Sequence, residues 1–184
     1  KPKDTDWVVV GSSPEEMIEK GFKQVGKNFP VFLHPNTNEE YALARKDRKT
    51  GVGHKNFQFN FSPSVTLEED LERRDLTINS MALDEDGNLI DPFNGAKDIE
   101  NKCFRPVSQA FFEDPLRALR VARFKAQFPE FFLHESMEQA LVKISTSNEL
   151  LNLSSERVWG EVVKGLEHDF HQFLQIIRNY KLHE

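Results

Sequence analysis

Apolar residues recur at spacings of three and four along the chain from Ser108 onward. This is the period of a helix that buries one face against a core. Short polar stretches interrupt the pattern, so it predicts separate helices that follow one another to the end of the chain. We expect these helices at residues 114–128, 134–144, 154–166 and 169–180.

The chain before residue 105 shows mixed patterns. The β-rich run from Trp7 to Val10, ended by Gly11, predicts a buried strand. Ser13 and Glu16 have the spacing of a capping box, which predicts a short helix closed by Gly21. Further strands are predicted at residues 23–25, 31–34 and 40–45.

Residues 46–105 add one loop, one helix and one hairpin to this picture. The polar segment 46–63 predicts a mobile loop followed by a short extended piece, with a plain surface loop as the alternative. Thr66 and Glu69 form a second capping box, which predicts a helix running into Arg73. A hairpin is predicted for residues 79–83 and 89–90, and a turn for residues 91–95. The patterns therefore indicate an α+β fold, with a mixed part up to residue 105 and an all-helical part over residues 106–184.

Composition indicates an ordinary cytoplasmic protein. With 184 residues, 38% apolar and 29% charged, the chain can build one core or two small subdomains that share one. The net charge of −6 argues against general affinity for nucleic acid, although a local basic groove remains possible. Cys103 is the single cysteine and cannot form an internal disulfide, which suits a reducing cytosol. We find neither a signal peptide nor an apolar run long enough to span a membrane, and no stable protein partner is implied.

Asp4 and Asp6 are candidate metal ligands. Alternate side chains of a strand share one face, so both carboxylates should point the same way. Carboxylates with water and substrate phosphates make Mg²⁺ sites, and a second Mg²⁺ about 3.5–4 Å away would complete a clamp for phosphoryl transfer. Glu40, on a neighbouring predicted strand, could supply a third carboxylate. Surface capping by the two aspartates is the alternative.

Three arginines follow an acidic pair at the predicted start of the helix 114–128. Asp114 and Pro115 suit a helix start, and Arg117, Arg120 and Arg123 recur every three residues. On a helix they fall within an arc of about 120° and could line a cleft that holds phosphates. We call these three residues the arginine row. The alternative is a solvated arginine face beside ordinary carboxylates.

The segment 73–79, Arg-Arg-Asp-Leu-Thr-Ile-Asn, is dense in polar groups between a helix and an apolar stretch. Its arginines could contact a phosphate or a ribose, while Asp75 and Asn79 could bond to sugar hydroxyls. A simpler explanation is that Arg73 and Arg74 stabilise the end of a helix through its dipole.

Taken together, these motifs resemble those of the class II tRNA nucleotidyltransferases, the bacterial CCA-adding enzymes, and among them the gammaproteobacterial type. The resemblance covers nearly the whole chain, and its specificity lies in the order of the motifs. They are Asp4-Thr5-Asp6-Trp7-Val8-Val9-Val10-Gly11, Glu39-Glu40-Tyr41-Ala42-Leu43-Ala44-Arg45, Arg73-Arg74-Asp75-Leu76-Thr77-Ile78-Asn79, Asp91-Pro92-Phe93-Asn94-Gly95 with Asp98, Glu113-Asp114-Pro115-Leu116-Arg117, and Glu156-Arg157-Val158-Trp159 with Glu161.

The resemblance implies a fold and a reaction. The fold would be a polymerase-β-like nucleotidyltransferase head with a small mixed sheet and flanking helices over residues 1–105, followed by an all-helical neck over residues 106–184 that recognises the nucleotide base. The reaction would add CCA to the 3′ end of tRNA from CTP and ATP, releasing pyrophosphate. Asp4 and Asp6 would hold the catalytic Mg²⁺ ions, with Glu40 as the third carboxylate. Residues 46–63 would match the family's flexible loop, which is needed for the switch from C to A addition.

The resemblance also assigns the nucleotide contacts. Arg74 would contact the ribose and phosphate region with Asp75 and Asn79 nearby, and Arg120 and Arg123 would hold the triphosphate.

Asp114 and Arg117 would bond to the Watson–Crick edge of the base. Cytosine and adenine both present an exocyclic amine beside a ring-nitrogen acceptor, so Asp114 can accept from the amine while Arg117 donates to the ring nitrogen. Guanine and uracil present the opposite pattern and would leave buried polar groups unpaired.

The chain also departs from the family pattern. The Gly-Gly-x-x-Arg-Asp element that precedes the two aspartates is missing, as are the C-terminal body and tail and the appended phosphohydrolase domain. We therefore expect the 184-residue chain alone to be weakly active or inactive. The alternatives are a poly(A) polymerase of the same superfamily, an enzyme adding only CC or only A, and a non-catalytic nucleotide- or RNA-binding module.

Overall fold

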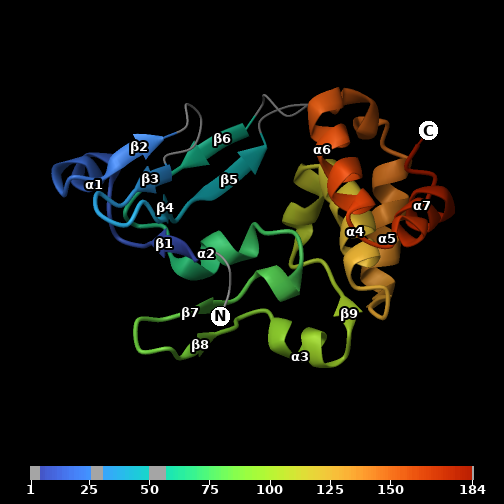
Figure 1. Cartoon of the computed structure of the whole chain (residues 1–184), viewed down its shortest axis with the longest axis horizontal. Coiled ribbons are helices and arrows are strands. Elements are labelled where there is room, and N and C mark those ends of the chain that lie inside the picture. Colours follow the sequence, from blue (N-terminus) through green and yellow to red (C-terminus); the bar gives the residue numbers. More distant parts are fainter. Residues whose placement is uncertain (1–4, 26–30, 50–56, 184) are drawn as a thin grey trace. The chain divides into compact units, whose positions relative to one another are not determined.

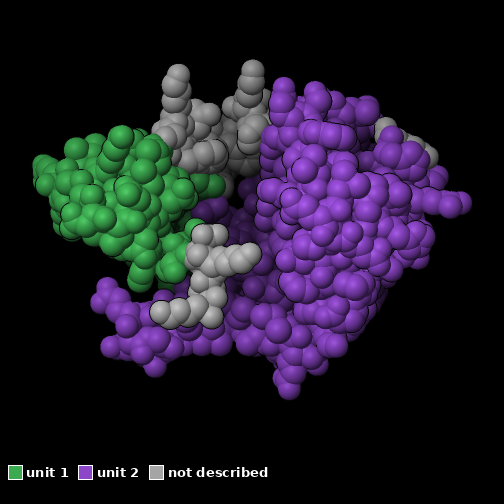
Figure 2. Space-filling view, in the orientation of Figure 1, with its two compact units in different colours: residues 1–48, 58–71 green, residues 49–57, 72–184 purple. Residues whose placement is uncertain are grey.

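A computed structural model of the chain describes residues 5–25, 31–49 and 57–183, excluding the side chains of residues 47–49 and 57–59 (Figure 1). It contains two compact units (Figure 2). Unit 1 comprises Lys1–Arg48 and Gln58–Leu71, and unit 2 comprises Lys49–Phe57 and Glu72–Glu184. Residues 72–105 thus pack with the helical part of the chain. The division into a head and a neck at residue 105 stays a prediction, since a family boundary need not follow packing.

Unit 1 is built on a four-stranded mixed sheet with the order β1-β4-β3-β2 (Figure 1). β1 pairs with β4 in parallel, while β4 with β3 and β3 with β2 are antiparallel. This agrees with the strands that the sequence predicts. Their bounds are Asp6–Val9 for β1, Lys23–Val25 for β2, Val31–Leu33 for β3 and Glu40–Leu43 for β4.

A short helix covers this sheet and closes a small core. In α1 (Pro14–Glu19), the Ser13 hydroxyl accepts from the Glu16 amide and the Glu16 carboxylate accepts from the Ser13 amide, which confirms the first capping box. Gly21 then takes a φ of +85°, the left-handed conformation in which glycine commonly ends a helix. Met17, Phe32 and Leu43 form a buried apolar cluster among the described residues of the unit, in which Val65 and Leu71 are also buried.

The second helix of unit 1 is also capped as predicted. In α2 (Leu67–Glu72), the Thr66 amide donates to the Glu69 carboxylate, and the Glu69 amide donates to the Thr66 hydroxyl. The buried Asp70 carboxylate accepts from the Arg45 amide at 3.1 Å and so joins α2 to the chain that follows β4.

The segment 46–63 differs from the predicted loop. β5 (Lys46–Lys49) and β6 (Phe57–Asn60) form a two-stranded sheet. The predicted extended piece is therefore confirmed, whereas the prediction of a loop at residues 46–49 is wrong. A strand of Lys, Asp and Arg has low intrinsic β propensity, but ladder hydrogen bonds to a partner can override that preference. The middle of the predicted loop, residues 50–56, lies outside the described residues.

Unit 2 begins with short elements. The predicted hairpin is confirmed, with Ala82 opposite Ile90 and Leu83 opposite Leu89. The predicted turn at residues 91–95 leads into α3, which the sequence does not predict. The parallel pair β9–β10 is not predicted either, so the prediction of helix alone after Ser108 is wrong at β10. The bounds are Thr77–Asn79 for the 3₁₀ helix η1, Ala82–Leu83 for β7, Leu89–Ile90 for β8, Gly95–Glu100 for α3, Cys103–Phe104 for β9 and Phe132–Leu133 for β10.

Local polar contacts and close packing explain α3. Both carboxylate oxygens of Asp91 accept main-chain amides at the start of the helix, from Gly95 at 2.7 Å and from Ala96 at 2.9 Å. A Cβ atom on Gly95 would lie 2.2 Å from the carbonyl oxygen of Thr77, so only glycine lets α3 approach η1 this closely.

The rest of unit 2 is a helical bundle around α4, which packs against α6 and α7 (Figure 1). The four predicted helices are confirmed and differ from the prediction only at their ends. Their shared core includes Val121 and Ala122 of α4 and Phe173 of α7. No helix in the described ranges has both the length and the apolarity that a membrane span requires. The bounds are Gln109–Glu113 for η2, Leu116–Gln127 for α4, Glu135–Ser145 for α5, Glu149–Asn152 for η3, Ser155–Leu166 for α6 and Phe170–Asn179 for α7.

Candidate functional site

Two of the three predicted metal-site carboxylates are neighbours in unit 1. Asp6 of β1 and Glu40 of β4 are register partners in the parallel pair, and both residues are exposed. Partners in a ladder share a face of the sheet, whereas the next pair along the strands, Trp7 and Tyr41, points to the other face. The Trp7 and Tyr41 rings stack there with centroids 5.4 Å apart. Asp4 lies outside the described residues.

The donor set at this end of the sheet suits a magnesium ion. Mg²⁺ prefers oxygen ligands and is commonly held by one or two carboxylates, with water and substrate phosphates completing its octahedron. Asp6 and Glu40 offer two exposed carboxylates on one face. Within the described part of the chain, no three acidic, histidine or cysteine side chains gather into a metal-binding group.

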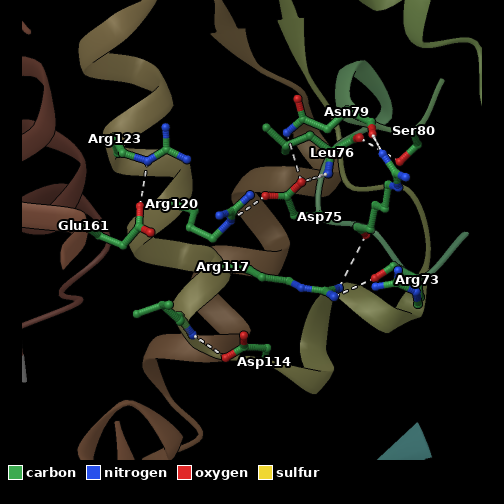
Figure 3. A network of polar contacts seen from close by, with 12 residues as sticks. Arg73, Asp75, Leu76, Asn79, Ser80, Asp114, Arg117, Arg120, Arg123 and Glu161 are labelled. Carbon is green, nitrogen blue, oxygen red and sulfur yellow. Dashed lines mark hydrogen bonds and ion pairs between the residues drawn. The ribbon is translucent and has the colours of Figure 1, made fainter. Parts of the chain in front are cut away.

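The polar residues of segment 73–79 lie together in unit 2 (Figure 3). Asp75 is only 5% exposed, and its Oδ1 atom accepts from the Leu76 amide at 2.8 Å and from the Asn79 side-chain amide at 3.0 Å. Its Oδ2 atom accepts from Arg120 Nε at 2.7 Å. Arg74 Nη1 donates to the main-chain oxygen of Asn79 at 3.0 Å.

These contacts determine the ionisation of Asp75. Burial alone would raise the pKa of the carboxyl, but the positive charge of Arg120 and the hydrogen bonds from Asn79, Arg120 and Leu76 outweigh it, so the pKa lies below its ordinary value. Asp75 is therefore a fixed carboxylate that holds Asn79 and Arg120 in place.

Arg117 is held by main-chain oxygens. Its Nη1 atom donates to Ala110 O at 2.7 Å and to Arg74 O at 3.4 Å. Its Nη2 atom donates to Arg73 O at 2.5 Å (Figure 3). Burial lowers the pKa of the guanidinium, against the opposing effect of the Asp75, Asp114 and Glu113 charges. The side chain thereby ties the Arg73–Arg74 main chain to the end of η2.

Asp114 lies directly before α4, between two partners. Its Oδ1 atom accepts from the Leu116 amide at 3.2 Å, which is the capping contact that the sequence predicts. Its Oδ2 atom accepts from Arg157 Nη2 of α6 at 2.6 Å, and both side chains are 22% exposed. The Nη1 atom of Arg157 is buried and has no hydrogen-bond partner among the described residues.

Each member of the arginine row is engaged by the chain itself. Arg117 binds main-chain oxygens, Arg120 binds Asp75, and Arg123 Nε donates to Glu161 Oε2 at 2.6 Å. The Arg123 side chain is 13% exposed, and its guanidinium carbon lies 4.1 Å from the centroid of the Phe124 ring. A solvated arginine face is thus wrong for Arg123. Its predicted contact with the triphosphate stays a prediction, as does that of Arg120, which is 34% exposed.

Arg157 and Glu161 belong to one of the sequence motifs, but the sequence alone assigns them no role. They stand four residues apart on α6, so they share a face of that helix. The one engages Asp114 and the other Arg123, and Glu161 is buried at 4% exposure. Two opposite charges four residues apart predict, from the sequence alone, that both side chains lie on the same face of a helix. The partners across the bundle could not be identified without the packing of α4 on α6.

Comparison with known proteins identifies the family. Residues 1–105 match the family described as the poly A polymerase head domain. The chain belongs to this family. A relative of this head-domain protein, the multifunctional CCA protein of Pseudoalteromonas atlantica, is 56% identical over 91% of the chain. The chain spans 42% of that relative's length.

Solved structures show the same fold. The CCA-adding enzyme of Bacillus stearothermophilus, in complex with CTP, superposes with a TM-score of 0.76 at 29% identity, over 96% of this chain and 43% of that one. The Thermotoga maritima CCA-adding enzyme, complexed with a tRNA, gives 0.73 at 25% identity, over 99% of this chain and 43% of that one. The resemblance to CCA-adding enzymes and the polymerase-β-like fold class are thereby confirmed for this head-domain protein.

Proposed function

We propose that this chain supplies the catalytic and nucleotide-binding residues for addition of CCA to the 3′ end of tRNA. The observation that carries the proposal is the 56% identity, over 91% of the chain, to a multifunctional CCA protein. CTP and a tRNA are bound to solved proteins of the same fold, and ATP completes the pair of nucleotides that CCA requires. A tRNA substrate and the free, buried Cys103 both suit the cytoplasm.

The reaction is a nucleotidyl transfer. The oxygen of the tRNA 3′-hydroxyl forms a bond to the α-phosphorus, the bond from that phosphorus to the β-phosphate oxygen breaks, and pyrophosphate leaves while the hydroxyl proton passes to solvent. Asp4 and Asp6 would hold the Mg²⁺ ions, with Glu40 beside Asp6 on the same face of the sheet. When bound, Mg²⁺ neutralises the charge that develops on the phosphate oxygens. The chain itself contributes alignment, because the reaction needs no covalent intermediate.

Asp114 and Arg117 would select the base. A carboxylate has about four acceptor positions, so Asp114 can accept a base amine as well as the Leu116 amide and Arg157. Arg117 has five N–H groups and keeps donors beyond its bonds to main-chain oxygens. Because those bonds hold the guanidinium still, a base with the wrong edge cannot be accommodated by moving it.

The sugar and phosphates would be bound by the residues around Asp75. Arg74 and Asn79 would contact the ribose and phosphate region, with Asp75 holding Asn79 in place. Arg120 is bonded to Asp75 through Nε, so its two Nη atoms can face the triphosphate. Arg123 would support the phosphates from a more enclosed position.

A poly(A) polymerase, which the description of the matching family names, is not favoured, because the relatives of this chain are CCA proteins. The products of the reaction distinguish the two. Incubation of a full-length protein that contains this chain with tRNA lacking its CCA end, CTP, ATP and Mg²⁺, followed by sequencing of the 3′ ends, should yield C-C-A and then stop. A long A tail would instead establish the polymerase, and binding of CTP without turnover would indicate a non-catalytic module.

A further inference from the structure

Unit 2 contains a pocket that shares no lining residue with the predicted nucleotide site. Its volume is about 410 Å³, which lies within the usual range for small-ligand sites. The chain after β9 forms one wall and α5 forms the other. The lining residues are Arg105, Pro106, Val107, Ser108, Gln109, Phe112, Ser136, Gln139, Ala140 and Lys143. We call this the Arg105–Lys143 pocket.

The lining includes two cations and no acidic residue. This is notable in a chain with 30 acidic and 24 basic residues, where acidic side chains are the commoner charged type. The other polar groups of the lining are two hydroxyls and two carboxamides, from Ser108, Ser136, Gln109 and Gln139. Such a set favours a ligand with negative charge and several hydrogen-bond acceptors.

Contacts with Asp98 and His134 hold Arg105 in a fixed orientation. Its Nε atom donates to Asp98 at 3.0 Å, its Nη2 atom donates to Asp98 at 3.3 Å, and its Nη1 atom lies 2.7 Å from His134 Nε2. Asp98 is only 3% exposed and also accepts from the Thr77 hydroxyl at 2.7 Å, whereas the Arg105 side chain is 38% exposed. Of the five guanidinium N–H groups these contacts use three, so two remain for a ligand. A donor already held in place loses little conformational entropy on binding.

Lys143 supplies the charge that is not compensated. Its Nζ atom lies 4.1 Å from the centroid of the Phe112 ring, and it has no ion pair or hydrogen bond within the described residues. Glu135, on the same helix, accepts from the Gln139 side chain at 3.1 Å. Because Asp98 already offsets the charge of Arg105, Lys143 leaves the pocket with a net positive charge.

We propose that the Arg105–Lys143 pocket binds a phosphate monoester carried on a small organic body. A monoester has a charge of about −1.5 to −2 at pH 7 and three strong acceptor oxygens, which match the forked donors of Arg105 and the ammonium of Lys143. Pro106, Val107 and Ala140 give the carbon skeleton an apolar wall. The pocket volume suits a pentose phosphate better than a free phosphate ion.

Calorimetric titration of the chain with ribose 5-phosphate, without Mg²⁺ or tRNA, tests this proposal. We expect saturable binding of one molecule per chain, none by ribose, and affinity reduced about tenfold in Lys143→Gln, since one charged hydrogen bond is lost. Lys164→Gln removes an exposed lysine of α6 outside the pocket, and Arg74→Ala alters the predicted nucleotide site; neither should change the affinity.

Lack of saturable binding, equal binding by ribose, or an unchanged affinity in Lys143→Gln would overturn the proposal. Loss of binding in Arg74→Ala but not in Lys143→Gln would show that the phosphate binds at the predicted nucleotide site, and would also overturn the proposal. Since no outcome depends on nucleotidyl transfer, the proposed CCA addition stands or fails separately.

Discussion

At the scale of single residues, the predicted nucleotide site consists of side chains that hold one another. Asp75 engages Asn79 and Arg120 (Figure 3). Asp114 engages Arg157. A residue of this kind affects both stability and catalysis when it is changed. Asp6, on the exposed face of the sheet, should affect catalysis alone.

Asp6→Ala should reduce nucleotidyl transfer by about 100-fold or more, because several kcal/mol of charge stabilisation in the transition state would be lost. The free energy of unfolding should change by no more than about 0.5 kcal/mol, as is usual for an exposed position. Turnover with CTP, in a full-length protein that contains this chain, and thermal unfolding measure the two effects. Asp86→Ala, at an exposed turn of unit 2, is the matched control and should leave both unchanged.

Asp75→Asn should lower the free energy of unfolding at pH 7 by about 2 kcal/mol, because Arg120 loses its charged partner. The loss of stability caused by Asp75→Asn should depend on pH. The folded pKa of Asp75 is depressed, so its contribution is fully present above the unfolded pKa of about 4 and is lost as pH falls through the lower, folded value.

Urea unfolding between pH 7 and pH 2.5 measures this dependence. The wild-type chain should lose stability below about pH 4 more steeply than Asp75→Asn. Parallel curves for the two proteins would show that the carboxyl is not stabilised in its charged form.

Arg157→Met should lower kcat/KM for CTP about tenfold, since Asp114 would lose the contact that orients its Oδ2 atom. Stability should fall by about 1 kcal/mol, because both partners are partly exposed. Arg157→Lys should restore part of the activity. Full activity in Arg157→Met would show that Arg157 does not orient Asp114.

At the scale of elements, features that depend on neighbours along the chain can be predicted from the sequence. Features that depend on contacts between distant segments cannot. The capping boxes at Ser13 and Thr66 depend on neighbours in the chain, so the starts of α1 and α2 are predictable. α3 combines a local cap, in which Asp91 accepts from the Gly95 and Ala96 amides, with the close approach of Gly95 to Thr77 O, which has no local signature. The same holds for the two-residue strands β9 and β10, which exist only as a pair.

Gly95→Ala should destabilise the chain by about 2–3 kcal/mol, because the new methyl group would collide with the carbonyl of Thr77. Gly160→Ala in α6 is the matched control. Nothing lies within 4 Å of a Cβ at that position, so this change should stabilise by up to about 1 kcal/mol through helix propensity. Urea unfolding of both variants gives the comparison.

At the scale of the whole molecule, the two units have cores of different size. Among the described residues, the buried apolar cluster of unit 1 is small and centres on Met17, Phe32 and Leu43, whereas that of unit 2 includes residues from Leu76 to Leu182. The sequence predicts the fold class and the order of elements well, because those follow from periodicity. It cannot predict that residues 72–105 pack with the helices, because that depends on contacts such as Arg117 with the Arg73 carbonyl.

Hydrogen–deuterium exchange should reflect this difference in the cores. Main-chain amides of β2, a strand at the edge of the small sheet, should exchange early, and those of α4 should exchange last. Mass spectrometry of peptides from residues 23–25 and 116–127 checks the order. Equal protection of the two peptides would mean that the units unfold as one.

The anchoring of Arg117 also limits how the proposed nucleotide preference could be re-engineered. Three main-chain oxygens accept from this guanidinium, and a lysine ammonium cannot reproduce the planar spacing of its donors. A designer who replaced Arg117 to admit guanine or uracil would therefore lose the connection between η2 and the Arg73–Arg74 main chain along with the proposed contact to the base. Asp114 ends in a two-oxygen group with only one main-chain bond, so new specificities should be sought there first.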